Sequence, residues 1–233
     1  AQWLRIENID RIVAYYAQNG DMSSAVFVKA MEEIATHMKE DALVLIETTV
    51  PPGATNLIAI PVLEKIRRGR GFNMPVKVAH SYERVMPGRE YISSIRNMWR
   101  QVSAVDERSL KEAVGFLGTI ITKELNVLSA PIETELAKVL ENTYRSVILA
   151  VSHDFDVLAE HMQANLWKII EGIRVRPTHS NILGPSLGVG GYCLPKDALL
   201  ALYAARQFFG MSLAESLLIL RANVINDLKP LRA

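Results

Sequence analysis

The fold is decided by Ala-Leu-Val-Leu-Ile-Glu-Thr-Thr-Val-Pro-Pro-Gly, residues 42–53. A short apolar run that is bounded by turn residues is typical of a strand buried on both faces. We therefore expect a strand from Asp41 to Val50 that ends at Pro51-Pro52-Gly53, and then a helix from about Ala54 to Arg67. A buried strand that leads through a tight turn into a helix is the repeating unit of a parallel α/β sheet.

The flanking segments repeat this alternation of helix and strand. Apolar residues three and four positions apart predict a helix that starts at Ser23 or Ser24, either of which can cap it, and runs to about Lys39. Further along, we expect a strand at Val76–Ala79, a helix at Ser109–Gly118 and a strand at Asn126–Leu128. The first half of the chain is therefore predicted to form an α/β domain with a parallel sheet.

The second half of the chain reads as helical. Pro131 and Gly172 bracket a long stretch without Gly or Pro, and we expect one long helix there. Its apolar residues recur at spacings of three and four: Leu140, Tyr144, Val147, Val151, Phe155 and Leu158. A helix this long usually packs against more than its own small domain, so residues 132–165 are predicted to form the seam of a homodimer. After a loop at Arg176–Pro195, two helices are expected, at about Asp197–Phe209 and Ser212–Asp227.

Composition excludes several classes of protein. Lys and Arg total 26 against 25 for Asp and Glu. The chain therefore lacks the excess of positive charge that favours binding to nucleic acid or to an anionic membrane. Apolar runs such as Val147–Val151 are too short to span a bilayer. One cysteine excludes an intrachain disulfide and fits a reducing cytosol. No HExxH or CxxC supports a metal site, and neither a GxGxxG after a strand nor a P-loop is present.

That single cysteine lies in Gly190-Gly191-Tyr192-Cys193-Leu194-Pro195-Lys196-Asp197. Paired glycines let backbone approach a ligand, and Pro195 suits the entrance of a helix. A helix N-terminus and a neighbouring Lys196 favour the thiolate form of a cysteine, which is the nucleophilic form. Asp197 could cap the helix or hold a proton. Cys193 is equally well interpreted as a small buried packing residue, and both interpretations stay open at this point.

Three further segments could carry chemistry. Lys138 and Asn142 are one helical turn apart, and a cation beside an amide donor can hold a developing oxyanion, although a solvated helix face is the simpler interpretation. The segments Glu47–Gly53 and Ser81–Gly88 each follow a predicted strand, where open α/β sheets bind ligands. Each is also explained as a plain turn between a strand and a helix. The five histidines form no ligand constellation and are expected in core or surface roles.

Taken together and in this order, these segments resemble the UDP-glucose/GDP-mannose dehydrogenase family, the nucleotide-sugar 6-dehydrogenases. The family carries patterns similar to STVPPG, SPERVxPG, ExxKxxENxxR and GxGGxCxxKD. They stand here at Thr48–Gly53, Ser81–Gly88, Glu135–Arg145 and Gly188–Asp197. The resemblance implies a Rossmann-like NAD-binding domain followed by an all-helical central domain with the dimerisation helix. Its domains would be residues 1–130 and 131–233.

The resemblance also implies a reaction and its residues. NAD⁺ would be the oxidant of a four-electron oxidation, in which a nucleotide sugar's C6 alcohol becomes a carboxylate through a thiohemiacetal and a thioester on Cys193. By position, Lys138 and Asn142 would stabilise the C6 oxyanion and contact the sugar nucleotide. Thr49 and Glu83 would position water and protons beside NAD, with Glu83 also a candidate base. Asp197 would act as base or orienting group, and Lys196 would reach the NAD pyrophosphate. Asn181, Ser186 and Gly190 would contact the substrate.

The chain also departs from the family pattern. Tyr82 stands where a proline is usual, Ala54 replaces a common threonine, and Arg176–Ile182 differs from the loop of the best-known UDP-glucose enzymes, so UDP-glucose, a UDP-N-acetylhexosamine and GDP-mannose all remain candidate substrates. The family's first strand with its GxGxxG turn and its C-terminal nucleotide-binding domain are not found, so a fragment, truncated at both ends, is expected. Two other interpretations stay open. One is a non-covalent 3-hydroxyacid or 6-phosphogluconate-type dehydrogenase, and the other is an inactive dimeric remnant.

Overall fold

The computed structural model describes residues 24–86, 88–212 and 217–229. These residues divide into two compact units, one that ends at Lys138 and one that begins at Val139, and each is described by itself. Within the described residues, no helix combines the length and the apolar character that a membrane crossing requires. Among the predicted features, Ser23 as a helix cap and Pro87 of the second motif lie outside the described residues.

The first unit is built on a four-stranded sheet in the order β1-β2-β3-β4. The strands are β1 (Leu43–Ile46), β2 (Lys77–His80), β3 (Arg100–Ala104) and β4 (Leu125–Val127). Strands β1 and β2 are parallel, as are β3 and β4, whereas β2 and β3 run antiparallel. The helices of the unit are α2 (Ala25–His37), η3 (Thr55–Ala59), α3 (Ile60–Gly69), α4 (Tyr91–Asn97) and α5 (Glu107–Gly118).

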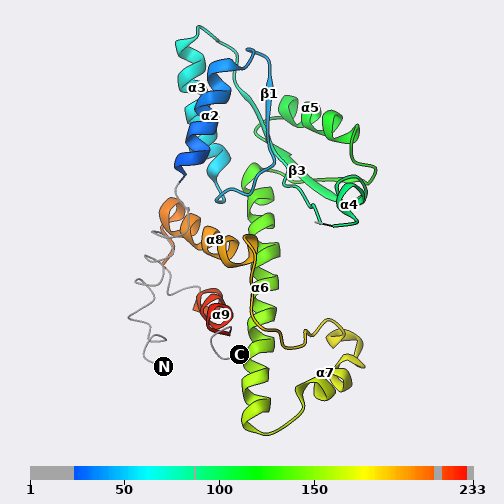
Figure 1. Ribbon diagram of the computed structural model, residues 1–233. Helices are drawn as coiled ribbons and strands as arrows, with labels where there is room; N and C mark the ends of the chain where they lie inside the picture. Colours follow the sequence, from blue (N-terminus) through cyan, green and yellow to red (C-terminus); the bar gives the residue numbers. More distant parts are fainter. Residues whose placement is uncertain (1–23, 87, 213–216, 230–233) are drawn as a thin grey trace. The chain divides into compact units, whose positions relative to one another are not determined.

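Side chains of β1 alternate between two apolar clusters, one on each face of the sheet. Val44 and Ile46 belong to the cluster that contains residues of α2 and α3. Leu43 and Leu45 pack against the cluster that contains residues of α5. Figure 1 shows the same layers, with α2 and α3 on one side of β1 and α5 on the other. A strand covered on both faces explains why residues 42–46 are continuously apolar.

The predicted α/β fold class is confirmed, but the sheet is only mostly parallel, because the unpredicted strand β3 runs antiparallel to β2. Each predicted strand is present but shorter or shifted by a residue, and the segment after Gly53 forms η3 and α3 instead of one regular helix. Strand β3 and helix α4 were not predicted, because β3 (Arg-Gln-Val-Ser-Ala) carries little apolar character. The predicted cap at Ser24 forms no side-chain hydrogen bond, since its φ of −68° and ψ of 2° are not the extended values of a capping residue.

The second unit is helical, as predicted. Its elements are the greater part of α6 (Pro131–His161), α7 (Leu166–Arg174), η4 (Pro177–His179), α8 (Cys193–Phe209) and α9 (Leu217–Leu228). The prediction of one unbroken helix from Pro131 to Gly172 is wrong, because α6 ends at His161 and α7 begins at Leu166. Gln163 adopts a left-handed φ of 53° between them, and Asn165 caps α7 by accepting a hydrogen bond from the Lys168 N–H. The chain thus leaves the helical conformation between α6 and α7 without a Gly or Pro residue.

A buried polar network joins α6, α9 and the start of α8 within the second unit. Asn226 Nδ2 on α9 donates to Ser146 O on α6 at 2.9 Å, and the Ser146 hydroxyl lies 3.3 Å from Asn223 Oδ1. Asn223 Nδ2 in turn donates to Pro195 O at 3.4 Å. Since buried polar groups require partners, these contacts fix the register of the helices. They position the first turn of α8, which begins at Cys193.

Candidate active site

In the first unit, Lys138 of α6 is seated on the loop that follows β2. Its Nζ donates to Glu83 O at 3.2 Å and lies 3.8 Å from Glu83 Oε1. The Lys138 side chain is only 14% exposed, so this ammonium has little water around it and depends on the loop for partners. Glu83 Oε2 accepts a hydrogen bond from Val85 N at 2.5 Å, which orients the carboxylate. The geometry therefore brings together two of the predicted catalytic residues.

Tyr82, which stands where the family usually has a proline, also contacts the Lys138 ammonium. Its side chain is buried, and the Lys138 ammonium lies 5.5 Å from the centroid of its ring. The Tyr82 hydroxyl donates to Gln101 Oε1 at 3.1 Å. A cation over an aromatic face is stabilised by the ring's electron density. Of the predicted oxyanion pair, Lys138 lies in this unit and Asn142 does not. Tyr82, in place of the usual proline, thus gives Lys138 an aromatic contact.

The Pro51-Pro52-Gly53 turn is anchored to α6 by Glu135. The Glu135 carboxylate accepts hydrogen bonds from Gly53 N at 2.6 Å, Thr55 N at 2.8 Å and Thr55 Oγ1 at 2.6 Å. Burial raises the pKa of Glu135, and these hydrogen bonds oppose the rise. Thr49, a predicted catalytic residue, is partly buried in the same loop, just after β1. The sequence pattern identifies Glu135 only as the first position of a motif and does not indicate its anchoring role.

His80, at the end of β2, is part of the core beside this loop. Its Nδ1 lies 2.7 Å from Thr134 Oγ1, which also lies 2.7 Å from Ser103 Oγ and donates to Pro131 O. Burial lowers the pKa of His80 to about 4. His80 is therefore a neutral residue of the core, one of the two roles expected for the histidines.

In the second unit, Asp197 holds the two remaining polar members of the predicted site. It is fully buried; its Oδ2 accepts from Asn142 Nδ2 at 2.6 Å, and its Oδ1 lies 2.7 Å from Lys196 Nζ. The prediction that Asp197 could cap the helix is wrong, because α8 begins four residues earlier, at Cys193, and the capping position is Tyr192. Cys193 is an exposed free thiol in the first turn of this helix.

The loop before Cys193 carries the predicted substrate-binding residues. The Ser186 hydroxyl lies 2.9 Å from His153 Nε2, and Asn181 Nδ2 donates to Tyr144 Oη at 3.3 Å. A Cβ added at Gly190 would meet no atom within 4 Å, so the backbone there is open to a ligand. At Gly184, by contrast, a Cβ would overlap the Trp167 ring. His153 and Gly184 were missed by the sequence analysis, since both contacts are long-range.

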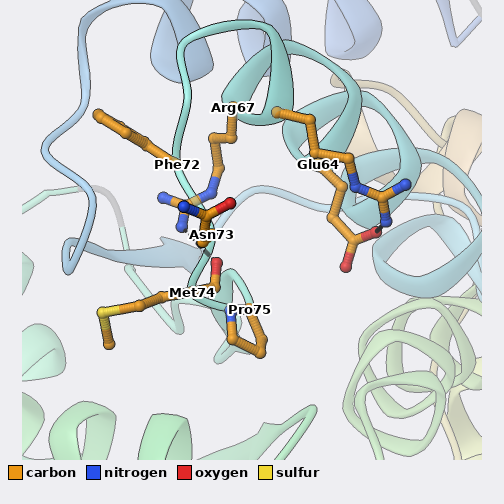
Figure 2. Close-up of a pocket in the computed structure, with 7 residues that line it drawn as sticks. Glu64, Arg67, Phe72, Asn73, Met74 and Pro75 are labelled. Carbon is orange, nitrogen blue, oxygen red and sulfur yellow. Dashed lines mark hydrogen bonds and ion pairs between the residues drawn. The ribbon is translucent and has the colours of Figure 1, made fainter.

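In the described part of the first unit, a cavity lies at each end of β2. One, of about 230 Å³, follows the carboxyl end and is lined by Glu83, Arg84, Trp99 and Arg100 among others. The other, of about 290 Å³, precedes the amino end and is lined by residues of α3 and of the Phe72–Pro75 segment (Figure 2).

Only the first of these cavities is placed where ligands bind in open α/β sheets. In the second, the Arg67 guanidinium serves the fold, since it donates to Met74 O at 2.9 Å (Figure 2) and to Glu40 O at 2.8 Å. No group of three or more His, Cys, Asp or Glu side chains in the described part of the chain could hold a metal ion.

Comparison with known proteins matches both halves of the chain to one family. Residues 16–114 match the NAD binding domain of the UDP-glucose/GDP-mannose dehydrogenase family, and residues 132–226 match its central domain. The UDP-N-acetyl-D-mannosamine dehydrogenase of Pyrococcus horikoshii is 35% identical over 185 residues, which are 78% of this chain and 43% of that protein. The chain thus spans about half the length of the curated relatives it matches.

Solved structures agree with this assignment. The UDP-N-acetyl-D-mannosamine dehydrogenase structure from Pyrococcus horikoshii has a TM-score of 0.78 and 32% identity, and the match covers 90% of this chain and 47% of that one. The NDP-N-acetyl-D-galactosaminuronic acid dehydrogenase from Methanosarcina mazei has a TM-score of 0.75 and 26% identity over 90% of this chain and 45% of that one. With both halves matched in sequence and in fold, the chain belongs to the UDP-glucose/GDP-mannose dehydrogenase family.

Proposed function

We propose that this chain carries the catalytic groups of an NAD-dependent nucleotide-sugar dehydrogenase, which oxidises the sugar at C6 from alcohol to carboxylate through Cys193. The observation that carries the proposal is the hydrogen bond from Asn142 to the buried Asp197, which lies on the helix that begins at the exposed Cys193 thiol. This hydrogen bond holds Asn142, a predicted oxyanion donor, against the first turns of α8, the helix that carries Cys193. The names of the relatives point to UDP-N-acetylhexosamines as the first substrates to test.

The residues present fit a bound dinucleotide at one edge of the sheet. Because β1 and β2 are parallel, with Ile46 opposite His80, the loops that carry Thr49 and Glu83 open at the same edge. Ligands bind at this edge in open α/β sheets. NAD⁺, when bound, accepts a hydride from C6 in each of the two oxidations. We assign Thr49 and Glu83 to contacts beside its nicotinamide, and Lys196 to its pyrophosphate.

The chain's own groups supply the remaining chemistry. The Cys193 thiolate forms a bond from Sγ to the C6 aldehyde carbon, and the carbonyl electrons move to oxygen. Lys138 and Asn142 donate hydrogen bonds to that oxyanion, which stabilises the charge as it develops. After the second oxidation C6 is a thioester carbon. Glu83, with Thr49, orients a water and takes its proton as the C–S bond breaks, which releases the carboxylate and restores the thiolate. Asp197 keeps Asn142 in place throughout.

The substrate loop and the assembly complete the proposal. Asn181, Ser186 and Gly190 are assigned to the sugar nucleotide, because they lie in the glycine-rich loop that ends at Cys193. Residues 1–130 are assigned to the NAD-binding domain and 131–233 to the central domain. We further propose a homodimer through α6, whose exposed apolar residues include Tyr144, Val151, Phe155 and Leu158.

The decisive experiment uses a full-length protein that contains this chain, NAD⁺ and a panel of nucleotide sugars. We expect two NADH per sugar oxidised, and a thioester on Cys193 that mass spectrometry detects after rapid quenching. Cys193→Ser should lower kcat by at least about a thousandfold, since the covalent step is lost. Two NADH with near-normal turnover in the Cys193→Ser variant would contradict the covalent mechanism and favour a non-covalent dehydrogenase.

Because Cys193 is the only cysteine of the chain, alkylation offers an independent check. In the full-length protein, iodoacetamide should label the Cys193 peptide and abolish turnover in step with that labelling, and substrate should protect against both. The 233-residue chain by itself should gain one carbamidomethyl group, and its Cys193→Ser variant, the matched control, should gain none. Full activity after complete labelling of Cys193 would exclude it as the nucleophile.

A further inference from the structure

Arg100, the first residue of β3, connects the two loops to which the proposed function assigns Thr49 and Glu83. It is a buried guanidinium, 6% exposed. Its Nε donates to Tyr82 O at 3.2 Å, and one of its terminal nitrogens donates to Ser81 O at 3.0 Å and is paired with Glu47 Oε1. All of these groups lie within the first unit. Arginine stays charged at every accessible pH, so a buried guanidinium is held only where its donors find partners.

The partners of Arg100 are adjacent in sequence to the proposed site residues. Glu47 comes directly after β1 and two residues before Thr49. Ser81 and Tyr82 come directly after β2 and before Glu83. One guanidinium therefore determines how far apart the Thr49 and Glu83 segments lie. A planar fork of donors can hold three acceptors in fixed directions, whereas a lysine ammonium cannot reproduce that geometry.

The loop after β2 depends on such side chains for its shape. Residues 81–86 form no helix or strand, so their backbone groups must find other partners. The successive carbonyls of Ser81, Tyr82 and Glu83 are all bonded by cations, the first two by Arg100 and the third by Lys138. Arg100 therefore supports the segment on which the Lys138 ammonium is seated.

We propose that Arg100 is a positioning residue that sets the place of Glu83, and through it of Lys138, relative to Thr49. The inference rests on the proposed function for its catalytic consequence. Its structural part, the ordering of residues 81–86 by one guanidinium, stands on the hydrogen bonds alone. Arg100 itself is not assigned a contact with substrate.

The test compares Arg100→Lys with Arg68→Lys, an exposed arginine on α3 that serves as the matched control. Hydrogen exchange of the chain should show about tenfold faster exchange at the amides of Val85 and Met86, which donate to Glu83 Oε2 and Ser94 Oγ, with α5 unchanged. In the full-length enzyme, kcat should fall about a hundredfold with KM nearly unchanged, because misplacement by about 1 Å has that effect.

Glu47→Gln separates the two connections of Arg100. It removes the ion pair but leaves the carbonyls of Ser81 and Tyr82 bonded, so exchange at Val85 and Met86 should stay as in the unmodified chain. If Arg100→Lys fails to fold, Glu47→Gln still tests the connection to the Thr49 segment: exchange at the Ser81 amide, which donates to Ile46 O, should become faster, and unchanged exchange there would overturn the proposal.

Unchanged exchange at Val85 and Met86 in a folded Arg100→Lys protein would overturn the proposal, whatever the enzyme does. So would a normal kcat in that variant when the parent enzyme turns over. If the unmodified full-length enzyme oxidises no nucleotide sugar, the proposed function fails. The hydrogen-exchange comparison alone then decides whether Arg100 orders residues 81–86.

Discussion

At the residue scale, buried charges in the first unit mark the places where distant segments are joined. Lys77 is 4% exposed and pairs with Asp41 and Glu112, which joins β2 to α5 and to the turn before β1. Glu135 joins the Pro-Pro-Gly turn to α6. A buried ion without partners is strongly destabilising, so each such residue constrains the segments it contacts. In this chain several of those constraints fall beside the proposed site.

His80 makes the stability of the chain depend on pH. Its pKa in the folded chain is about 4, against 6.5 for an unperturbed histidine. Between these values the unfolded chain binds a proton that the folded chain does not, so stability is full above pH 6.5 and falls as the pH decreases toward 4. The loss from this group should reach about 3 kcal/mol. Urea unfolding at a series of pH values measures it.

His80→Asn should flatten that pH dependence, since an amide can still form a hydrogen bond with the Thr134 hydroxyl and does not titrate in this range. His37→Asn, at an exposed position on α2, is the control and should leave the slope between pH 6.5 and 4 unaltered. If the His80→Asn variant lost as much stability on acidification as the parent chain, another group would be responsible.

The site could be predicted from sequence where its residues share one helix. Lys138 and Asn142 are four apart, and both lie on α6. The partners of these residues could not be predicted, because Glu83 and Asp197 are each 55 positions away from the residue they contact. The roles of Tyr82 and Arg100 depend on the antiparallel pairing of β2 with β3. Such a pairing is fixed by tertiary packing and not by any local pattern.

At the element scale, the break between α6 and α7 shows why a helix end was missed. The α6 helix closes with Gln163 N–H donating to Glu160 O at 3.0 Å and Ala164 N–H donating to Ala159 O at 2.8 Å. These two bonds form a Schellman motif, in which the residue after the helix is left-handed and is usually glycine. Here that position is Gln163, with φ 53°. The α8 helix ends at Phe209, as predicted, and is followed by Gly210 in the left-handed conformation, with φ 69°.

Gln163→Gly should therefore stabilise the chain. A left-handed conformation costs a non-glycine residue about 1–2 kcal/mol, while glycine's greater freedom in the unfolded chain offsets part of the gain. We expect the free energy of unfolding to rise by about 0.5–1 kcal/mol, measured by urea denaturation. Gln163→Ala is the control, because alanine keeps the Cβ and should give no gain. A Gln163→Gly variant less stable than the Gln163→Ala variant would show that the Gln163 side chain has a role of its own.

At the scale of the whole molecule, α6 carries a row of exposed apolar residues that the second unit leaves uncovered. The sheet of the first unit has a packed cluster on each face. In the second unit, α6 keeps Tyr144, Val151, Phe155 and Leu158 exposed, at spacings of seven, four and three. They follow one face of the helix. Three of these side chains also line a cavity of about 390 Å³ that α6 forms with residues 173–183. An apolar stripe of this length on a single helix is the geometry of a helix-to-helix interface.

If α6 forms a homodimer through this face, the chain should elute with twice its mass of 26.0 kDa in size-exclusion chromatography with light scattering at micromolar concentration. Val151→Lys places a charge in the middle of the stripe, where burial against a partner would leave it unpaired, so the mass should return to 26.0 kDa. Glu160→Lys, nine residues further on and therefore on the opposite side of α6, is the matched control and should remain dimeric. Equal masses for the two variants would remove α6 as the interface, and a monomeric parent chain would exclude a dimer of this chain alone.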